Sequence, residues 1–534
     1  MTPHPDISGR PRWQTAGLFI PPLVLLTPFA SFLKFQEYPL LSLEVGYLAA
    51  ALAVLGLALG ALIRWGGRAG TALVLSALVV VFADFQFEIR LTYLALGGGA
   101  FLVFAWFAGR ALLPVFAAAA AVVFLSTLIL PAQLKDAEIV LASPEDIRNE
   151  LPPILHVILD EHIGIEGIES DTEWEKQARA DLTAFYLEYG FRLFGGAYAN
   201  YTETFNSIPN LLNNTLSTED FEYVTDGADG LSAVKENAYL STLSDRGYKI
   251  RIYQSKYFNF CEAARISLLS CSSYNYTGLG NLDKLTDSPG VRAELILSRF
   301  LNRSRIYGLS RSIYQNLAAA GFLKLRRLEN NNFAPLASYP FFRLIENDMA
   351  EKARGQVFFA HLLIPHRPFM FDSTCEVVLD HPFDNMEIRS EAWLVEYRKA
   401  YYEQVACTTK LMRHLFDSLR RSGIFDQTTI IVHGDHGSRI GAKAPVLENW
   451  QSLTPSDLRA HYSTLFAVRA PGIKAGYDDR LFSIGRLLDA VVNRNGTDLD
   501  PTPDESHQVI VSGNDKGPME KKPLGDFRLG ESKN

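Results

Sequence analysis

The sequence predicts an N-terminal α-helical transmembrane bundle followed by an α/β domain whose mostly parallel central sheet is flanked by helices. The bundle is indicated by apolar side chains that run in long blocks through the first 131 of the 534 residues. The sheet is indicated by short apolar, β-branched runs such as residues 154–159 and 429–433, which are typical of buried strands in parallel sheets. Both runs lead into acidic residues, and ligands of open α/β sheets gather where the strands end.

Five apolar blocks can be marked in the first part of the chain. They cover residues 16–33, 41–63, 71–83, 92–109 and 111–130. About twenty apolar residues are needed to cross a hydrocarbon core roughly 30 Å thick, and the third block is the shortest of the five. The whole chain is 48% apolar with a mean hydropathy of +0.04, which is high for a soluble protein. We therefore expect about five membrane spans.

Positive charges are unevenly distributed between these blocks. Arg10 and Arg12 precede the first block, Arg64 and Arg68 separate the second and third, and Arg110 separates the fourth and fifth. The two other connections carry acidic as well as basic residues. Because basic loops stay in the cytoplasm, we expect a cytoplasmic N-terminus and, after five crossings, an exported remainder of the chain. The first block is too long for the apolar core of a cleavable signal, so we expect none.

Composition divides the chain into four parts. Residues 1–131 form the transmembrane domain, and residues 132–152 form a polar, acidic linker. Residues 153–498 carry the strand and helix patterns of the exported domain. Residues 499–534 are rich in Pro, Asp, Gly and Lys, and we expect this tail to be flexible.

All four cysteines lie in the exported part, which suits an oxidising compartment. We favour disulfides that join Cys261 to Cys271 and Cys375 to Cys407, although three pairings are compatible with the sequence. Neither a Cys-x-x-Cys motif nor a Cys/His cluster is present, so we expect no structural zinc module.

Two pairs of candidate metal ligands follow the predicted strands. Asp435 and His436 stand before Gly437, and together they offer a hard oxygen ligand and an imidazole, as a Zn²⁺ or Mn²⁺ site requires. Taken alone, the same tripeptide also occurs as a helix cap or a turn. Asp160 and Glu161 follow the strand at residues 154–159, and alternation along the strand directs them to different faces. We therefore expect at most one of these two acids to be a strong ligand, and a solvated acidic pair is the alternative.

Two hydroxyl residues lie at the predicted start of a helix. Thr204 and Ser207 precede Pro209, and the helix dipole favours an alkoxide at this position. A metal ion can also deprotonate such a hydroxyl. The alternative is a helix cap that has no chemical role.

Four histidines accompany these residues. His366 lies between two prolines, in a rigid loop, and His461 precedes another apolar run. We interpret His361 and His433 as structural, because both lie within apolar runs. Polar groups from several strands thus point to one crevice.

The ordered set of these residues resembles the alkaline phosphatase superfamily in its sulfatase-like branch. The set is Asp160, Thr204, His366, Asp435 with His436, and His461. Five spans with an exported catalytic domain are similar to the phosphoethanolamine and phosphoglycerol transferases of the bacterial envelope. The phosphoethanolamine transferases carry their nucleophile in Thr-x-x-Ser-x-Pro, which Thr204-Phe-Asn-Ser207-Ile-Pro209 matches.

The resemblance implies a role for each matched residue. Thr204 is the nucleophile and a metal ligand, with Ser207 as the second candidate nucleophile. Asp160 takes the position of the first acidic ligand, where the transferases usually carry Glu, and Glu161 is like the second acid of the sulfatases. Asp435 and His436 complete the metal site. The Ser-Arg that formylglycine sulfatases carry after their nucleophile motif is absent, which disfavours that class.

In the same way, His366 and His461 match substrate-binding histidines of the family. The implied cofactor is a divalent metal, Zn or Mn, with Ca or Mg as alternatives. The implied activity moves a phospholipid headgroup through a threonine adduct to an envelope glycan or lipid acceptor, at a bacterial inner membrane. A membrane-tethered hydrolase of phosphate or sulfate esters is the main alternative, and a non-catalytic binding protein is another. We expect no nucleic-acid partner.

A basic segment at residues 291–327 is a candidate for contact with the membrane lipid. The segment contains eight Arg and Lys residues and a single acidic residue, Glu294. Apolar residues recur between them at helical spacing. Basic amphipathic helices lie on anionic membrane surfaces, so we expect this segment to dock beside the spans. A solvated helix of the exported domain is the alternative.

Overall fold

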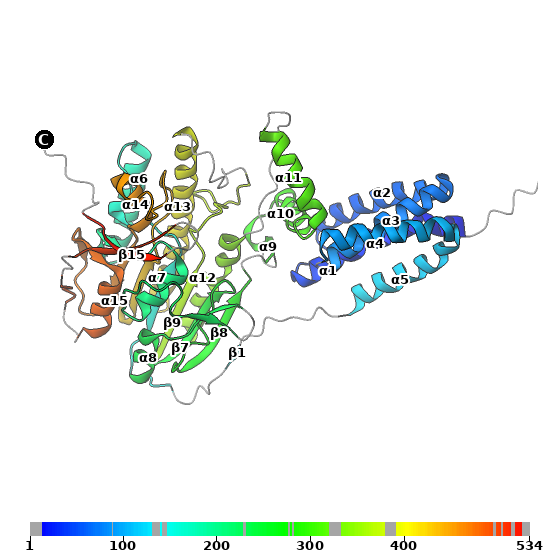
Figure 1. Ribbon diagram of the computed structural model, residues 1–534. Coiled ribbons are helices and arrows are strands. Elements are labelled where there is room, and N and C mark those ends of the chain that lie inside the picture. Colours follow the sequence, from blue (N-terminus) through cyan, green and yellow to red (C-terminus); the bar gives the residue numbers. More distant parts are fainter. Residues whose placement is uncertain are drawn as a thin grey trace, which may run out of the picture. The chain divides into compact units, whose positions relative to one another are not determined.

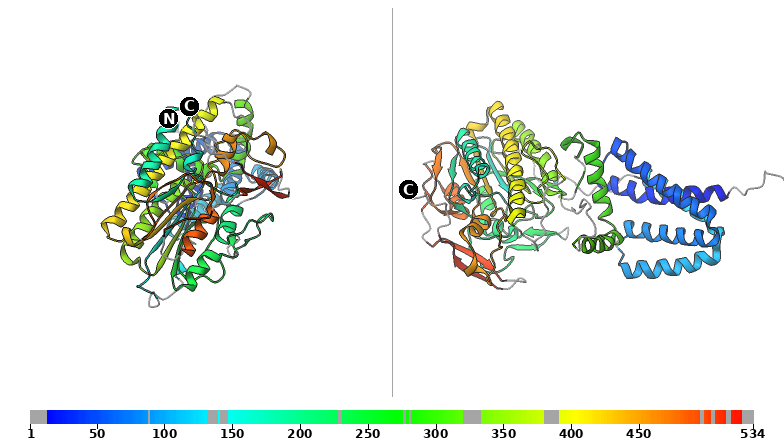
Figure 2. Two further views of the ribbon diagram at one scale, coloured as in Figure 1. Left: turned by 90° about the vertical axis from the view of Figure 1, so that its left-hand side faces the viewer. Right: turned by 90° about the horizontal axis from the view of Figure 1, so that it is seen from above.

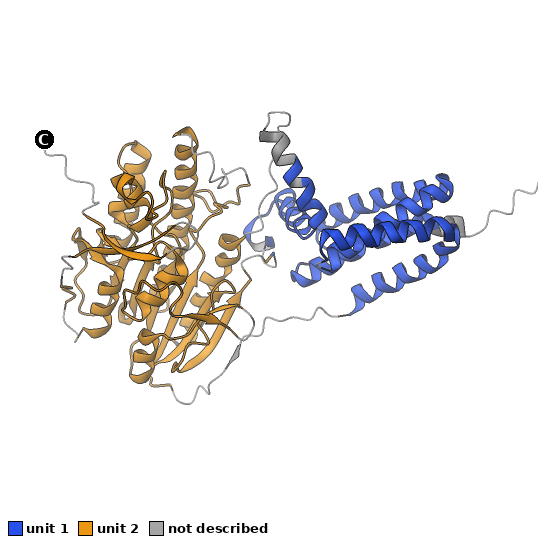
Figure 3. Ribbon diagram, viewed as in Figure 1, with its two compact units in different colours: residues 1–135, 279–331 blue, residues 136–278, 332–534 orange. Residues whose placement is uncertain are grey.

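The computed structural model divides into two compact units (Figure 3). Unit 1 comprises residues 1–135 and 279–331, and unit 2 comprises residues 136–278 and 332–534. The residues that the structure describes are 13–87, 89–130, 139–140, 147–227, 231–275, 278–279, 282–319, 333–379, 391–494, 498–502, 506–513 and 518–525. The predicted exported domain is therefore interrupted, because residues 279–331 group with the apolar helices. Most of the predicted linker lies outside the described residues.

Unit 1 is helical (Figure 1). Its helices are α1 Trp13–Phe35, α2 Leu43–Trp65, α3 Gly67–Gln86, α4 Leu91–Ala108, α5 Leu113–Ile129, α9 Leu282–Leu285, α10 Pro289–Leu301 and α11 Arg305–Ala319. α1 packs against α2 and α5, and α3 packs against α4. Ile20, Ile63 and Leu75 are buried between the helices, whereas Val54 and Val103 are exposed. Helices that are apolar on their outer as well as their inner faces are typical of lipid surroundings.

Four stretches among the described residues are long and apolar enough to cross a membrane. They are Gly17–Phe35, Leu43–Trp65, Gly67–Gln86 and Leu91–Ile129. The last has 39 residues and contains both α4 and α5, which a 3₁₀ turn at Gly109–Leu112 separates. Gly109 has a φ of 56°, which glycine adopts without steric cost, so the chain can turn there. The predicted apolar helical bundle is confirmed, and five crossings remain a prediction.

Unit 2 contains a nine-stranded sheet within the described part of the chain. In spatial order its strands are β1 Ile139–Val140, β8 Leu268–Tyr274, β7 Lys249–Ser255, β9 Gln356–Leu362, β2 Ile154–Leu159, β10 Thr429–Gly434, β11 Phe466–Arg469, β3 Arg192–Phe194 and β12 Gly476–Asp478. The five strands from β8 to β10 are parallel, and β1 and β11 are antiparallel to their neighbours. β2, β9 and β10 are buried almost throughout, as their apolar sequences predict.

Helices cover both faces of this sheet (Figures 1 and 2). One set is α7 Thr204–Leu212, α8 Ala238–Asp245 and α15 Ile484–Asn493; the other is α6 Glu173–Glu188, α12 Ala334–Lys352 and α13 Glu391–Arg421, with α14 Pro455–Tyr462 nearby. The first set packs Ile208, Leu240 and Leu487 against the sheet. In the second set, Phe185 of α6 stacks on Phe416 of α13. The predicted α/β fold is confirmed.

Two further features of unit 2 bear on the sequence predictions. The favoured disulfides, Cys261–Cys271 and Cys375–Cys407, are both present. The predicted flexible tail, however, contains a hairpin of β14 Gln508–Ser512 and β15 Met519–Pro523. Its apolar residues, including Val509, pack on Tyr198 and Tyr462, and this burial explains why the prediction of flexibility is wrong for these residues.

Small paired strands complete unit 2. They are β4 Ala197–Tyr198 with β13 Phe482–Ser483, and β5 Val224–Asp226 with β6 Ser232–Val234.

Candidate metal and nucleophile site

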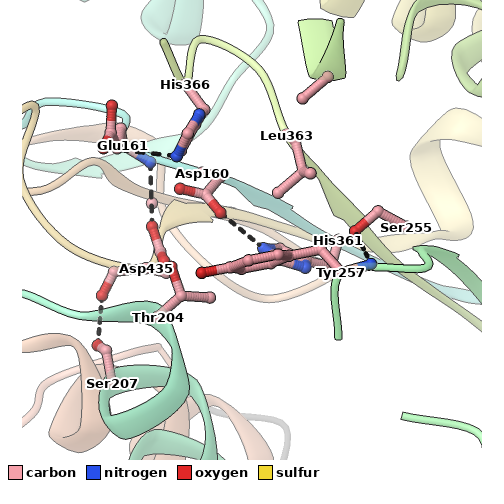
Figure 4. Close-up of polar contacts among 12 residues, drawn as sticks. Asp160, Glu161, Thr204, Ser207, Ser255, Tyr257, His361, Leu363, His366 and Asp435 are labelled. Atoms are coloured by element: carbon pink, nitrogen blue, oxygen red, sulfur yellow. Dashed lines mark hydrogen bonds and ion pairs between the residues drawn. The ribbon is translucent and has the colours of Figure 1, made fainter. Parts of the chain in front are cut away.

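The candidate site lies at the carboxyl ends of three neighbouring parallel strands. The register pairs Leu159 of β2 with Gly434 of β10 on one side and with Leu362 of β9 on the other. The residues that follow these strands therefore emerge at the same edge of the sheet, as the sequence predicts. Figure 4 shows the side chains that meet there.

Asp160, His361 and Asp435 form the centre of the site. Asp160 Oδ2 lies 3.2 Å from His361 Nε2, and all three side chains are fully buried. Asp160 Oδ1 has no hydrogen-bond partner among the described residues. Burial and the neighbouring Asp435 raise the pKa of Asp160 to about 7, and burial lowers the pKa of His361 to about 4. The three ligand atoms lie within 4.8 Å of one another.

Asp435 and His436 are held in place by the backbone. Asp435 Oδ1 accepts hydrogen bonds from the amides of Glu161, at 3.0 Å, and His436, at 2.9 Å. Burial raises the pKa of Asp435, but His436, His361 and these hydrogen bonds outweigh burial and lower it. His436 Nδ1 donates to the carbonyl of Gly437 at 2.9 Å, so Nε2 faces the site, 3.3 Å from Asp435 Oδ2.

α7 brings the two predicted hydroxyl residues to this edge. Thr204 is the first residue of α7, and its Oγ1 lies 3.3 Å from His436 Nε2. Ser207, one turn further, donates its hydroxyl to the carbonyl oxygen of Asp435 at 2.5 Å. Thr204 thus faces the metal-ligand candidates with its oxygen, whereas the Ser207 hydroxyl is engaged with the backbone. Of the two, the geometry favours Thr204 as nucleophile.

Glu161 is surrounded by positive groups. Its Oε1 lies 3.4 Å from Arg439 Nη1, 3.6 Å from His366 Nε2 and 4.0 Å from Arg367 Nε. Burial raises the pKa of Glu161, but these three groups outweigh burial and lower it to about 2. The predicted strand alternation does not extend to Glu161, because β2 ends at Leu159 and Glu161 has a φ of 61°. Asp160, Glu161 and His366 also form a second group whose ligand atoms lie within 4.8 Å of one another.

His461 is placed beside the site by its backbone. It lies in the last turn of α14 and is 3% exposed, and its carbonyl accepts the amide of Gly437 at 3.0 Å. Its ring Nδ1 lies 2.9 Å from the carbonyl of Asp457. The structure thus brings His461 next to the Asp435-His436-Gly437 loop, and its role in substrate binding stays a prediction.

Three residues of this region were not predicted as site residues from the sequence. His361, interpreted as structural, directs Nε2 at Asp160. Arg439 is partly buried and contacts both Glu161 and Glu203. Tyr257 reaches into the same cluster from the segment after β7, where burial and the charge of Asp160 raise its pKa (Figure 4). The signal for Arg439 was its position three residues after His436, whereas no local pattern marks Tyr257.

The donor set fits a divalent metal ion. Two buried carboxylates lie close together here: the charge of Asp435 raises the pKa of Asp160, and one oxygen of Asp160 is unpaired among the described residues. Buried negative charge of this kind is costly unless a cation compensates it. Carboxylate oxygens, imidazole nitrogens and a hydroxyl are ligands that suit Zn²⁺ or Mn²⁺.

Comparisons with known proteins identify a family for this chain. A family model described as Sulfatase matches residues 186–462, more than half of the chain. No curated protein sequence matches the chain. Similar solved structures include the C-terminal periplasmic domain of EcEptC from Escherichia coli in complex with Zn, with 11% identity, a TM-score of 0.40 and coverage of 70% of this chain and 95% of that one.

Two further solved structures have comparable scores. The phosphonate monoester hydrolase SpPMH from Silicibacter pomeroyi has 12% identity and a TM-score of 0.40, and the match covers 69% of this chain and 81% of that one. An alkaline phosphatase superfamily protein from Vibrio parahaemolyticus has 12% identity and a TM-score of 0.38, and the match covers 70% and 78%.

The match of the family model over more than half of the chain defines the class of protein as a sulfatase-like enzyme. The chain belongs to the sulfatase family. The family uses a divalent metal, and the buried cluster described above is the candidate place for it.

Proposed function

We propose that this enzyme is a membrane-anchored phosphotransferase that moves a phospholipid headgroup, of the phosphoethanolamine or phosphoglycerol type, through a covalent adduct on Thr204. The acceptor is a glycan or lipid of the cell envelope. One observation carries the proposal: Thr204 stands at the N-terminus of α7 with Oγ1 3.3 Å from His436 Nε2, in a chain that also carries membrane-capable helices.

The surroundings of Thr204 suit a nucleophile. The helix N-terminus favours negative charge on its oxygen, and His436 Nε2 and the carboxylate of Asp435 lie beside it. Thr204 Oγ1 loses its proton to solvent and attacks the phosphorus of the donor as an alkoxide. The bond from phosphorus to the diacylglycerol oxygen breaks, and that oxygen takes a proton from a nearby acid. His366, which is partly exposed at the rim of the site, is our candidate for this acid. The acceptor hydroxyl then displaces Thr204 from phosphorus and restores it.

Positive side chains are available for the phosphoryl oxygens. Arg439 and Arg367 both lie within 4.0 Å of Glu161, beside the nucleophile and the metal-ligand candidates. Guanidinium groups match the planar spread of charge on phosphate oxygens. A metal held by Asp160, Thr204, Asp435 and His436, with Glu161 as a less certain ligand, would supply electrophilic stabilisation of these oxygens. We propose Zn or Mn as that metal.

The proposed setting is a bacterial inner membrane. Five crossings with a cytoplasmic N-terminus would place unit 2 on the extracytoplasmic side, and the two disulfides suit that side. A lipid donor explains why a catalytic domain would be attached to several spans. We propose that residues 1–131 form the membrane spans and that residues 153–498 form the exported domain. Within the second range, residues 279–331 group with the spans.

The experiment follows a headgroup label. The full-length enzyme in liposomes is given phospholipid labelled in the headgroup, with and without a crude envelope acceptor, and diacylglycerol release and the fate of the label are measured. We expect release that depends on Thr204 and on added metal, with label moved to the acceptor. Water-soluble labelled headgroup that forms equally well without acceptor would establish the hydrolase alternative. No release with any metal would contradict both.

A further inference from the structure

Two buried acids of the apolar helices hold the segment that contains α10 and α11. Glu44, which is 1% exposed at the start of α2, pairs with Arg292 of α10 at 3.2 Å. Asp84, which is 4% exposed near the end of α3, accepts the hydroxyl of Ser304 at 2.5 Å and the amide of Arg305 at 3.0 Å. Asp84 thus caps the N-terminus of α11 from another helix, where a carboxylate is favourable.

Aromatic packing strengthens the same contact. The ring of Phe300, at the end of α10, lies 5.2 Å from Phe29, 5.4 Å from Phe32 and 4.4 Å from Phe85, measured between ring centroids. Phe300 is 5% exposed, so the end of α10 is embedded between α1 and α3. The guanidinium of Arg303 lies over the rings of Phe32 and Phe35.

All of these contacts lie at one end of the bundle. They involve the last turns of α1 and α3 and the first turn of α2. From this end α11 runs across the direction of the apolar helices, as Figure 1 and the right-hand view of Figure 2 show. A helix that crosses the end of a membrane bundle lies along the membrane surface when the bundle spans the bilayer.

α11 presents an apolar face that the described residues leave uncovered. Ile306 is 36% exposed, Leu309 53% and Ile313 55%, and their spacing of three and four places them on one side of the helix. Gly308 and Ser312 lie on other sides, and both are exposed. Arg303 and Arg305, at the start of the helix, are exposed as well.

We infer that α11 is an interfacial helix whose face of Ile306, Leu309 and Ile313 inserts into the lipid leaflet at this end of the bundle. Two observations favour lipid as the occupant. Apolar side chains of the spans are also exposed at the same end of the bundle, such as Phe35 and Phe87. The segment around it is also strongly basic, which suits anionic headgroups. The inference concerns contact with the bilayer and therefore goes beyond the proposed reaction.

Spin labelling tests this contact on the full chain. The four native cysteines are all in disulfides, so an introduced cysteine supplies the thiol to label. Leu309→Cys is matched with Gly308→Cys, where an added side chain meets no atom within 4 Å. Ile313→Cys and Ser312→Cys form a second pair in case one variant fails to fold. Each labelled protein is placed in liposomes of phosphatidylethanolamine and phosphatidylglycerol, and collision rates with oxygen and with a water-soluble nickel chelate are measured.

The inference predicts that labels at positions 309 and 313 collide with oxygen and lose access to the nickel chelate, whereas labels at 308 and 312 keep that access. Equal access of the nickel chelate at all four positions would overturn it, because α11 would then lie in water. Labels at 309 and 313 that are shielded from both reagents would also overturn it, because protein would then cover the face.

Discussion

His361 Nε2 lies 3.2 Å from Asp160 Oδ2, although the two residues belong to different strands and are 201 positions apart in sequence. Both side chains are fully buried, and Asp435 completes a group of three ligand atoms within 4.8 Å. A neutral imidazole between two buried carboxylates is a suitable ligand or positioning group for a metal ion. His361 is therefore part of the candidate site.

Replacement of His361 should weaken metal binding. We expect His361→Asn to lower the affinity for Zn²⁺ by about 10- to 100-fold, the usual cost of losing a group that ligates or orients a ligand. Calorimetric titration of the metal-free, full-length enzyme measures this effect. His414→Asn is the matched control, because His414 lies on α13 with an exposed side chain. If the His361 variant and wild type bind Zn²⁺ with equal affinity, His361 has a structural role only.

The raised pKa of Asp160 predicts how the stability of the metal-free enzyme depends on pH. Burial and Asp435 raise this pKa from 3.8 to about 7 in the folded protein. The buried site favours the protonated carboxyl of Asp160 over the carboxylate. The contribution of Asp160 to the free energy of unfolding is therefore fully present below about pH 4, and it is lost as the pH rises through about 7.

Thermal unfolding of chelated enzyme at several pH values checks this dependence. We expect the melting temperature to fall between about pH 4 and pH 7, and Asp160→Asn to flatten that fall. Added metal should restore stability at the upper end of the range. An identical slope in wild type and Asp160→Asn would show that another group is responsible.

The two hydroxyls of α7 should respond differently to replacement. Thr204→Ala should abolish turnover, because it removes the proposed nucleophile. Ser207→Ala removes a hydrogen bond to the Asp435 carbonyl, and we expect it to cost about 1–3 kcal/mol of stability while most of the activity remains. Turnover and chemical denaturation, measured on the same preparations, separate the two effects. The opposite pattern would make Ser207 the nucleophile.

Replacement of Arg439 should lower kcat/KM even when the positive charge is kept. It lies 3.4 Å from Glu161 and 3.1 Å from Glu203, and it also donates to the carbonyl of Thr202. Lysine keeps the charge but cannot make these contacts together. We expect Arg439→Lys to lower kcat/KM by about tenfold or more, which corresponds to the loss of one charge-assisted hydrogen bond.

A matched arginine tests whether this effect is local. Arg480 pairs with Asp478 and Asp500 and lies outside the candidate site. Arg480→Lys should leave kcat/KM within about twofold of wild type. Equal losses in the two variants would point to a general effect on folding.

Several parts of the site could be predicted because their signals are local. Asp160 and Asp435 each follow a β-branched run, and Thr204 begins a helix, so each can be recognised within about ten residues of sequence. His361 could not, since a histidine inside an apolar strand resembles a core residue. Its role depends on the register that pairs Leu159 with Leu362, and this register is a property of the folded sheet.

Long-range contacts also explain where the compact units differ from the predicted domain organisation. The segment at residues 279–331 joins the apolar helices because Glu44 and Asp84 bind it, and in sequence these are isolated acids beside apolar blocks. The hairpin at residues 508–523 is short and flanked by polar residues. It is ordered because it packs on distant tyrosines and because the Ile510 amide binds the Asn200 carbonyl at 2.8 Å.

The central claim is that Thr204 carries the transferred group. The most direct test is intact-mass measurement of the full-length enzyme after incubation with native membrane lipids in lipid nanodiscs, for wild type, Thr204→Ala and Ser207→Ala. We predict a covalent adduct on wild type and on Ser207→Ala and none on Thr204→Ala, with a mass that identifies the headgroup. An adduct that persists in Thr204→Ala and disappears in Ser207→Ala, or full turnover by Thr204→Ala, would contradict the account.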